Sequence, residues 1–482
     1  MLDYQYKTKP YDHQKDALEK SWEDTEHALF MEMGCGKSKV LLDNITILYL
    51  KGLINAALIV APKGVYDNWV DGEIPTHVPD YIDKQVYRWS PSETQKNQKE
   101  REEILKFSKD LNFVVMNIEA FSTKKGTEFA SKFLLNKRVL FAIDESTTIK
   151  SPSAARTKNT LRLAKYAVHR RILTGSPVTR SPLDLYTQCE FLDPALLGFS
   201  SYYSFRARYA EMVDRSAGGR TFKQVIGYKN LDELNELLQP FSYRILKKDC
   251  LDLPDKVYTT RKIEMTPEQK KAYDEIKRYA MTELSNSEQV SVTSVITQLL
   301  RLHQISCGFT RTDTKQDVEL KSARLEELMS ILEETEGKVI IWANYRYDIQ
   351  RILRAIQDQY GKASVGAYYG DTTDDERRNT VQLFQDKSSE LKYIVGNTQT
   401  GGYGINLTAA NTVVYYSNNF DLEKRLQSED RAHRIGQNNK VTYIDIICKN
   451  TVDEKIVNSL KAKQDIASKV LGEEKSWKDW IV

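Results

Sequence analysis

The sequence predicts an α/β protein built from two units, each with a mostly parallel sheet flanked by helices. Strand-like apolar runs alternate with helical segments twice along the 482 residues, first before Leu253 and again from Lys338. Between these stretches, Leu253–Lys256 breaks regular structure and marks a boundary, and a strand-like run follows at Val257–Ile263. A chain of this length is also expected to hold two or three domains.

The composition is that of a soluble globular protein, with 40% hydrophobic and 28% charged residues. No apolar run is long enough to span a bilayer, and the N-terminus lacks the apolar core of a secretion signal. The five cysteines include no C-x-x-C pair, so we expect no zinc site or disulfide framework and a reducing compartment. The net charge of +3 does not by itself indicate nucleic acid, and any such site must come from local patches.

The first unit is organised around Phe30–Val40, which reads F-M-E-M-G-C-G-K-S-K-V. Gly34 and Gly36 would let backbone N–H groups close around phosphate oxygens. Lys37 would neutralise phosphate charge, and the Ser38 hydroxyl would ligate Mg²⁺. Met31 stands where this pattern usually has its first glycine. Taken alone, the segment therefore leaves a glycine-containing turn with a surface lysine as the alternative.

Three buried strands are expected in this unit, at Ala57–Ala61, Val114–Ile118 and Val139–Ile143. The third strand ends in Asp144 and Glu145. Two carboxylates at the carboxyl end of a strand, downstream of a phosphate loop, suit a Mg²⁺ ligand followed by a base that activates water. A solvated acidic turn is the common alternative. The order and separation of the two motifs favour the catalytic interpretation.

Two further features of the first unit have weaker signals. Gln14 precedes an amphipathic helix and could read adenine with its amide, although on its own it is better explained as a surface residue. Phe205–Tyr209 interleaves aromatic and basic residues and could touch a nucleic-acid backbone. An amphipathic helix packed on its own unit explains Phe205–Tyr209 at least as well.

The second unit is expected to begin with helices at Pro267–Leu284 and Val292–Ile305. Its predicted strands are Val339–Ala343, Val365–Tyr369, Lys392–Gly396, Thr412–Tyr416 and Val441–Ile447. We expect Gln427–Gln437, Q-S-E-D-R-A-H-R-I-G-Q, to be a helix with Arg431 and Arg434 on one face. Two such arginines could reach the γ-phosphate held by the first unit and stabilise the transition state. A solvated charged helix is the alternative.

The set of motifs resembles the Swi/Snf-type (Rad/Snf-like) DNA-dependent ATPases, the double-stranded-DNA translocase branch of helicase superfamily two. The resemblance runs from about Tyr11 to Ile456 and is specific because several blocks occur in the order of that branch. In the first half these are M-E-M-G-C-G-K-S, L-I-V-A-P-K-G-V-Y-D-N-W, D-E-S-T-T-I-K-S-P and L-T-G-S-P-V-T-R-S-P-L-D-L. In the second half they are M-T-P-E-Q-K-K-A-Y, L-L-R-L-H-Q-I-S-C, T-G-G-Y-G-I-N-L-T-A-A and D-R-A-H-R-I-G-Q.

The resemblance implies a P-loop NTPase helicase core of two RecA-like lobes, with ATP and Mg²⁺ between them and duplex DNA across both. Lobe 1 would occupy residues 1–240, with a helical insertion at 195–240, and a linker would follow at 241–265. A helical insertion at 266–335 would precede lobe 2 at 336–475.

Site residues carry over by motif position. The catalytic residues would be Lys37, Asp144, Glu145, Arg431 and Arg434, with Ser38 and Asp144 as metal ligands. The nucleotide would be held by Gln14, Met33, Gly34, Cys35, Gly36, Lys37, Ser38 and Gly404. DNA phosphates would meet Lys63, Thr174, Asn344 and Thr398.

Three positions depart from the family pattern. Thr147 replaces the residue, usually His, that closes the D-E-x-H motif, which puts the relay between ATP and DNA in doubt. Gln399 replaces a common arginine, and Ile245 follows Arg244 where a second arginine is usual. None of these positions is hydrolytic, so we expect an active ATPase.

The leading hypothesis is a monomeric ATP-dependent translocase on double-stranded or branched DNA in the cytoplasm, associated with the nucleoid of a bacterium or of a phage-infected cell. Residues 225–248 resemble family members that rewind DNA and remodel forks, so fork reversal or branch migration is a second outcome for the same motor. Two different functions stay open, an ATP-gated DNA-binding clamp with slow turnover and an RNA helicase.

Overall fold

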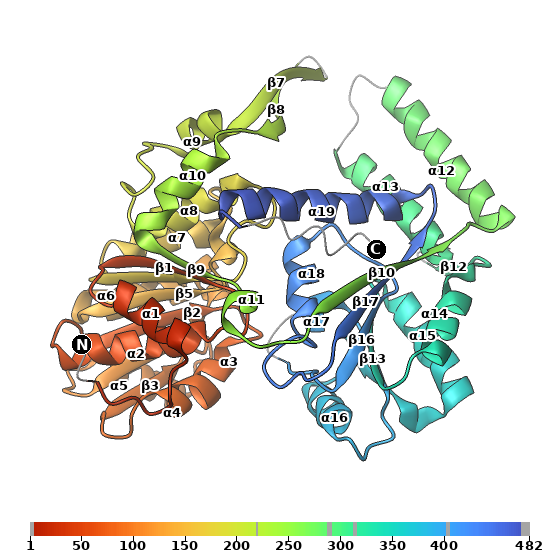
Figure 1. The fold of residues 1–482 in the computed structure, drawn as a ribbon. Helices are drawn as coiled ribbons and strands as arrows, with labels where there is room; N and C mark the ends of the chain where they lie inside the picture. Colours follow the sequence, from red (N-terminus) through yellow and green to blue (C-terminus); the bar gives the residue numbers. More distant parts are fainter. Residues whose placement is uncertain (1–3, 218–219, 287–291, 312–315, 402–404, 474–482) are drawn as a thin grey trace. The chain divides into compact units, whose positions relative to one another are not determined.

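The computed structural model describes residues 4–217, 220–286, 292–311, 316–401 and 405–473. These residues form two compact units (Figure 1). Unit 1 comprises Met1–Glu211, Gly227–Asp252 and Ile466–Glu474, and most of unit 2 is Leu253–Asp465. Each unit has its own parallel sheet, so the predicted α/β class with two sheets is confirmed.

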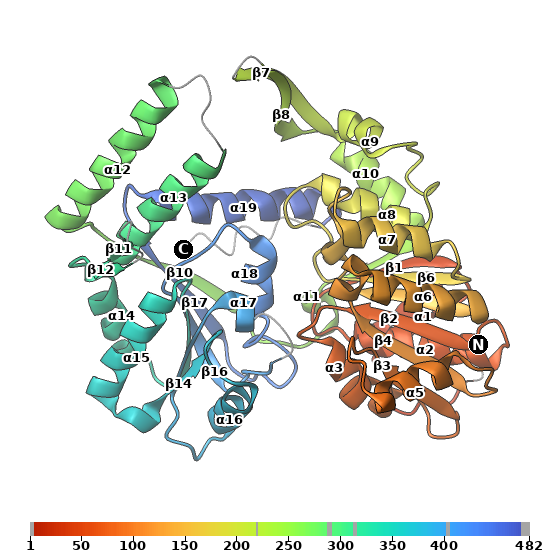
Figure 2. The same ribbon diagram turned by 180° about the vertical axis from the view of Figure 1, so that it is seen from behind.

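The sheet of unit 1 has seven strands in the order β3-β4-β2-β5-β6-β1-β9, and neighbouring strands pair in parallel. Its central strands are fully buried because helices cover both faces (Figures 1 and 2). The three predicted strands are confirmed within a few residues at each end. The bounds are β1 Glu26–Met31, β2 Ala56–Ala61, β3 Lys84–Arg88, β4 Leu111–Asn117, β5 Val139–Asp144, β6 His169–Leu173 and β9 Ser242–Ile245.

The helices of unit 1 connect these strands, as parallel pairing requires. The helix α2 is almost wholly buried along its length, since it follows the phosphate loop into the core. The main helices are α1 Asp12–Ser21, α2 Lys37–Leu50, α5 Gln95–Leu105, α6 Lys124–Asn136, α7 Ala155–Ala164 and α8 Leu185–Leu192. Three helical segments follow β2 without a break: α3 Tyr66–Asn68, the π-helical segment η1 Trp69–Glu73 and α4 Ile74–His77.

The predicted helical insertion at 195–240 is only partly helical. It contains α9 Tyr202–Tyr209 and α10 Leu231–Leu238, but between them β7 Ala210–Ala217 and β8 Arg220–Tyr228 form a two-stranded sheet. The run T-F-K-Q-V-I-G-Y within β8 is rich in β-branched and aromatic residues, which favour a strand over a helix.

The sheet of unit 2 has six parallel strands in the order β10-β17-β16-β13-β15-β14. The five predicted strands are all present, and the sixth, β10, corresponds to the strand-like run expected at Val257–Ile263. The bounds are β10 Lys256–Ile263, β13 Lys338–Trp342, β14 Val365–Tyr368, β15 Tyr393–Gly396, β16 Ala410–Tyr415 and β17 Val441–Cys448.

The segment 241–265, expected to be a linker, contributes β9 to the first sheet and β10 to the second. The backbone N–H and C=O groups of both strands are therefore hydrogen-bonded within a sheet. In an unpaired linker these groups would bond to water instead. Between β9 and β10 the chain forms the short helix α11 Lys247–Cys250.

The helices of unit 2 are α12 Pro267–Asn286, α13 Val292–Cys307, α14 Ala323–Glu334, α15 Arg346–Tyr360, α16 Asp374–Gln385, α17 Thr398–Gly401, α18 Leu422–Glu429 and α19 Val452–Val470. A small antiparallel pair, β11 Phe309–Arg311 and β12 Asp317–Glu319, lies between α13 and α14. The predicted helices α12 and α13 are confirmed, within two residues at each end.

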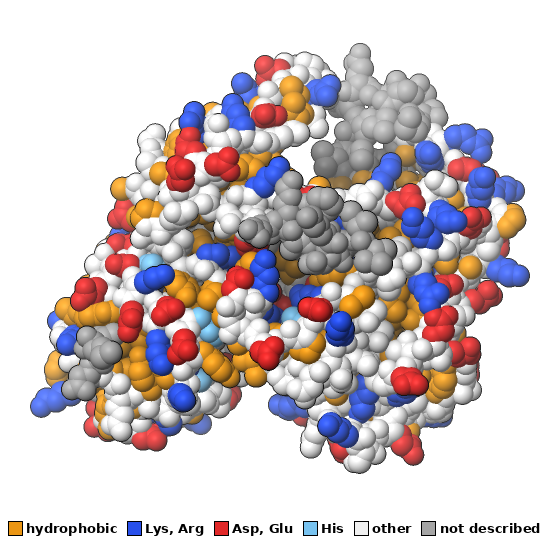
Figure 3. Space-filling model, viewed as in Figure 1, with side chains coloured by type: hydrophobic (Ala, Val, Ile, Leu, Met, Phe, Trp, Pro, Cys, Tyr) orange, Lys and Arg blue, Asp and Glu red, His pale blue; other side chains and the backbone are white. Residues whose placement is uncertain are grey.

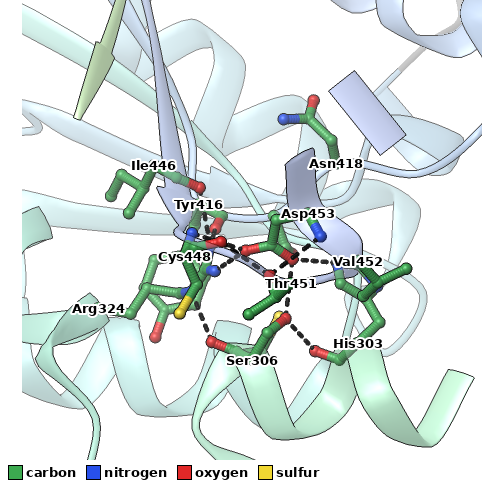
Figure 4. Close-up of polar contacts among 12 residues, drawn as sticks. His303, Ser306, Arg324, Tyr416, Asn418, Ile446, Cys448, Thr451, Val452 and Asp453 are labelled. Atoms are coloured by element: carbon green, nitrogen blue, oxygen red, sulfur yellow. Dashed lines mark hydrogen bonds and ion pairs between the residues drawn. The ribbon is translucent and has the colours of Figure 1, made fainter. Parts of the chain in front are cut away.

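A buried ion pair between Arg324 and Asp453 joins several elements of unit 2 (Figure 4). The Arg324 guanidinium also donates to the backbone oxygens of Ser306 at 3.1 Å and Ile446 at 2.9 Å. Asp453 accepts from the Ser306 hydroxyl at 2.8 Å and from the Cys448 backbone N–H at 3.0 Å. Both charges are thus paired and hydrogen-bonded, the condition under which buried charges persist. They hold α13, α14, β17 and α19 together.

A second buried carboxylate of unit 2, Asp348 in α15, lacks such support. Its buried oxygens lack the set of hydrogen bonds that supports Asp453, and the Cys307 thiol is only a weak hydrogen-bonding neighbour. Burial raises the pKa of Asp348 from 3.8 to about 7, although the charges of Arg351 and Arg324 lower it. The Cys307 thiol lowers this pKa as well, and Asp453 raises it. The folded protein therefore retains a proton that the unfolded chain loses near pH 3.8.

We expect Asp348→Asn to remove a pH dependence of the stability of unit 2. In the wild type, this group's contribution is fully present below its unfolded pKa of 3.8 and is lost as the pH rises through about 7. At about pH 8 the variant should be more stable by up to about 4 kcal/mol, at about 1.4 kcal/mol per pH unit. Hydrogen exchange of β13 and β16 amides in urea, at several pH values, measures this difference.

Asp358→Asn on the same helix is the matched control, because Asp358 is exposed and its loss should leave the pH profile unchanged. Parallel pH profiles for the wild type and Asp348→Asn would contradict the assignment.

On the face shown in Figure 3, Lys and Arg side chains are interspersed with Asp and Glu. This mixture agrees with the small net charge of +3, so charge-dependent binding on this face would depend on individual side chains. Within the described residues, no helix is both long enough and apolar enough to cross a membrane.

Candidate active site

The candidate site of unit 1 lies at the carboxyl edge of its sheet. Strands β1, β6 and β5 are consecutive neighbours and all run parallel. The phosphate loop follows β1, Thr174 and Gly175 follow β6, and Glu145 follows β5. Since the carboxyl ends of parallel strands meet at one edge, the loop and the acidic pair are separated by a single strand.

The two loop glycines have the backbone conformation that the sequence predicts. Gly34 and Gly36 have φ angles of +87° and +83°, which side chains rarely tolerate. A Cβ on Gly36 would lie 2.1 Å from Gln14 Nε2. On Gly175 a Cβ would lie 2.9 Å from the backbone nitrogen of Met33. The loop is therefore packed closely between α1 and the turn after β6.

Lys37 and Ser38 begin α2, directly after the loop. The Lys37 ammonium is 8% exposed and donates to the backbone oxygens of Met31 at 2.9 Å and Glu32 at 3.4 Å. Ser38 is half-buried. A phosphate group at this helix N-terminus would meet backbone N–H groups, the helix dipole and the ammonium together.

The structure explains why Met31 can replace the usual first glycine. Met31 is the last residue of β1, pairs with Ile245 of β9 and is buried in the hydrophobic core. Its side chain therefore points into the core, and the loop has its two positive-φ glycines after it.

Gln14 lies against the loop and is 6% exposed. Its amide donates to the Cys35 backbone oxygen at 3.2 Å and accepts from the Tyr11 backbone N–H at 3.0 Å. His13 contacts the same Cys35 oxygen at 2.9 Å. Gln14 therefore lies beside the phosphate loop, where its amide bonds to the Cys35 backbone.

The acidic pair is held in a strained, well-defined geometry. Asp144 is 8% exposed, and its Oδ1 accepts the Glu145 backbone N–H at 3.1 Å while its Oδ2 accepts the Trp69 indole N–H at 3.0 Å. Burial raises the pKa of the Asp144 carboxyl, whereas the Trp69 hydrogen bond and the Lys37 charge lower it. Glu145 has φ +51° and ψ +61°, a left-handed conformation that persists in folded proteins mainly at functional sites.

The residues at this edge fit ATP and Mg²⁺. A hydroxyl and a carboxylate oxygen are the hard ligands that Mg²⁺ takes, here from Ser38 and Asp144. Gly34 and Gly36 carry no side chain that could block the backbone N–H groups, and the Lys37 ammonium is a cation for phosphate oxygens. Glu145 follows the candidate metal ligand directly and is half-buried.

The predicted helix over Gln427–Gln437 is wrong in its extent. Helix α18 ends at Glu429, and Arg431 and Arg434 lie in the turns that follow. Glu429 is fully buried and bonded to Arg425 and Tyr258, which fixes the end of the helix at that residue.

The two arginines nevertheless meet. Nη1 of Arg431 and Nη1 of Arg434 both donate to the Ile405 backbone oxygen, at 3.4 and 3.3 Å. Arg431 also donates from Nε to the Gln427 oxygen at 3.0 Å, which agrees with its burial. Gly404, the other expected nucleotide contact of this half, lies outside the described residues.

The four expected DNA contacts have different environments. Lys63 is exposed just after β2. Thr174 is 1% exposed, and its hydroxyl donates to Glu145 Oε2 at 3.4 Å, so it belongs to the acidic pair's surroundings. In unit 2, Asn344 and Thr398 follow the adjacent strands β13 and β15 and are linked through the Asn419 amide, at 3.4 and 3.5 Å.

The residues that depart from the family pattern lie in well-described parts of the fold. Thr147 is buried in the turn after Glu145, and Gln399 is exposed on α17. Arg244 donates from Nη1 to the backbone oxygens of Phe30 at 2.8 Å and Gly175 at 2.9 Å. Arg244 therefore connects the ends of β1 and β6 below the loop.

Sequence reasoning did not identify Trp69 as a neighbour of the acidic pair. A tryptophan that follows a buried strand is usually interpreted as a core residue. No sequence pattern distinguishes packing in the core from donation of the indole N–H to a carboxylate. Trp69 is indeed 1% exposed, but its indole N–H reaches Asp144.

Family models match both halves of the chain. The SNF2-related domain matches residues 13–309, and the helicase conserved C-terminal domain matches residues 321–436. The chain belongs to the SNF2-related family. The resemblance drawn from the motifs is thereby confirmed.

The SNF2-related chain has curated relatives in yeast and bacteria. It is 27% identical over 466 residues to the transcription regulatory protein SNF2 of Saccharomyces cerevisiae, covering 91% of this chain and 26% of that protein. It is 25% identical over 450 residues to an uncharacterized ATP-dependent helicase of Mycoplasma pneumoniae, covering 92% and 40%. It is 27% identical over 440 residues to the putative ATP-dependent helicase/translocase YwqA of Bacillus subtilis, covering 88% and 44%. The chain spans less than half the length of these relatives.

Among solved structures, the SNF2-related chain is similar to the SWI2/SNF2 ATPase core of Sulfolobus solfataricus in complex with dsDNA. The similarity covers 100% of this chain and 97% of that chain, at 22% sequence identity and a TM-score of 0.43.

Proposed function

We propose that this protein is a DNA-dependent ATPase that moves along double-stranded DNA. The observation that carries the proposal is the single sheet edge of unit 1 where the phosphate loop, Asp144 and Glu145 are gathered. Membership of the SNF2-related family, and relatives whose names include ATP-dependent helicase and translocase, support nucleic acid as the partner.

In this proposal each site residue of unit 1 has a defined role. Lys37 and the loop N–H groups bind the phosphates, and Gln14 reads the base. Ser38 and Asp144 would hold Mg²⁺, which when bound neutralises charge on the phosphate oxygens. Glu145 orients the attacking water and accepts its proton, since a carboxylate beside the metal ligand is placed for both tasks.

The remaining residues of the proposal come from both units. Arg431 and Arg434 act on the transferred phosphate, and their meeting at Ile405 supports a shared role. Lys63, Asn344 and Thr398 grip DNA phosphates, whereas Thr174 links Glu145 to the neighbouring turn. ATP binding and release then shift the grip along one strand. We propose a monomer acting on the DNA of the cell in which it is made, with branched DNA among its substrates.

The test is ATP hydrolysis with Mg²⁺ in the presence of no nucleic acid, duplex DNA, single-stranded DNA, a model fork or RNA. Lys37→Ala, purified in the same way, is the blank for contaminating ATPases. We expect strong stimulation by duplex or forked DNA. Displacement of a third strand from a DNA triplex would then measure movement, and DNA affinity should fall steeply with salt because phosphate contacts dominate it.

Three results of this test would point to a different function or outcome. Stimulation by RNA alone would indicate an RNA helicase. DNA binding without stimulated hydrolysis would indicate an ATP-gated clamp. Hydrolysis stimulated by forks far more than by plain duplex would favour remodelling of branched DNA.

A further inference from the structure

Both oxygens of the Asp144 carboxylate are fixed by the protein. Oδ1 accepts the Glu145 backbone N–H at 3.1 Å, and Oδ2 accepts the indole N–H of Trp69 at 3.0 Å. Trp69 is 1% exposed, so its donor group is shielded from water and turned toward the carboxylate. An indole has one N–H and no other polar atom, so the Trp69 side chain makes its hydrogen bond here.

The fold places Trp69 by an unusual backbone segment. Strand β2 is the direct neighbour of β5, so the helix that follows β2 starts at the same sheet edge as Asp144. Within that helical run, Trp69–Glu73 form a π-helical turn between α3 and α4. Such turns are rare overall, and those that occur are often found at functional sites.

We propose that Trp69 is a positioning residue for Asp144 as a Mg²⁺ ligand. The inference rests on the proposed function and adds a residue to its metal site. A carboxylate has about four lone-pair directions, and two donors leave the others available to a metal ion. Partners of this kind orient metal ligands, and their loss lowers metal affinity about 10–100-fold. Trp69 touches neither metal nor substrate and acts through Asp144.

The test removes the N–H and keeps an aromatic ring. Trp69→Phe is one variant, and replacement of Trp69 by 3-benzothienylalanine is a second that preserves the shape of the indole. The readout is the Mg²⁺ concentration needed for tight binding of a fluorescent ADP analogue, in full-length protein without DNA. We expect that concentration to rise about 10–100-fold in both variants, with kcat for ATP recovering when Mg²⁺ is saturating.

Trp89→Phe is the matched control for loss of core volume. Trp89 is 2% exposed in the same unit, stacked on Phe129 with 5.0 Å between ring centroids, and lies beside Arg101. A purely structural role for Trp69 would lower the unfolding midpoint of both Phe variants alike and leave their Mg²⁺ requirement unchanged.

The outcomes separate this inference from the function on which it rests. Folded Trp69 variants with the wild-type Mg²⁺ requirement would overturn the positioning role and leave the proposed function standing. A wild-type protein whose ADP binding does not respond to Mg²⁺ at all would overturn the metal site itself. A shifted Mg²⁺ requirement in the benzothienyl protein, with the Trp89 control unchanged, would establish that the N–H is the group that matters.

Discussion

Glu145→Gln is expected to reduce kcat for ATP hydrolysis by about 10²–10⁴-fold while nucleotide binding is retained. The amide has the same shape as the carboxylate but cannot accept a proton from water. The Thr174 hydroxyl, which donates to Glu145 Oε2 at 3.4 Å, can donate equally to the Gln oxygen, so the side chain should stay in place. Stimulated hydrolysis and binding of a fluorescent ATP analogue, measured on the same preparation, give the two quantities.

Glu119→Gln is the matched control for this variant. Glu119 is an exposed carboxylate that follows β4, at the same sheet edge but two strands from β5. Its loss should leave kcat unchanged. A Glu145→Gln protein that hydrolyses ATP at the wild-type rate would rule out Glu145 as the base.

Arg434→Ala is expected to lower DNA-stimulated kcat by about 10³–10⁵-fold, the range for arginines that stabilise phosphoryl-transfer transition states. Arg434 is half-buried and its guanidinium donates to the Ile405 oxygen at 3.3 Å. Arg431 still donates to that oxygen in the variant, so unit 2 should stay folded. Arg431 is less suitable for this test because it is buried and bonded to the Gln427 oxygen.

Two further variants sharpen the test of Arg434. Arg434→Lys keeps the charge but loses the planar fork, and partial activity would separate charge from geometry. Lys440→Ala removes a nearby cation whose side chain is 69% exposed, and it should not change kcat. If Arg434→Ala and Lys440→Ala hydrolyse ATP equally well, Arg434 has no part in the reaction.

Much of this architecture follows from local sequence. Short apolar runs between helices predicted the central strands of both sheets, because parallel strands are buried on both faces and need no alternation. The phosphate loop and the acidic pair were predictable because their residue types, their order and their positions after strands are all required by the same chemistry.

The parts that sequence did not predict depend on tertiary contacts. The segment 241–265 was expected to be a linker, although it holds a strand-like run at Val257–Ile263. The pairing of β9 with β1 and of β10 with β17, which puts this segment into the two sheets, depends on tertiary contacts. Hydrogen bonds from Tyr258 and Arg425 to the buried Glu429 carboxylate set the end of α18. Local helix propensity does not indicate these bonds. Thr174 and Trp69 could not be assigned to the acidic pair, since their contacts join residues 29 and 75 positions apart.

The buried place of Met31 has a consequence for how such proteins are recognised. A pattern search that demands glycine at the first loop position would pass over this chain, although the loop's two left-handed glycines and its lysine are intact. In this chain the first position ends a strand and packs into the core, so a large apolar side chain is compatible with the loop. A search pattern that allows large apolar residues at this position, and keeps the later glycines fixed, should recover divergent members that the stricter pattern rejects.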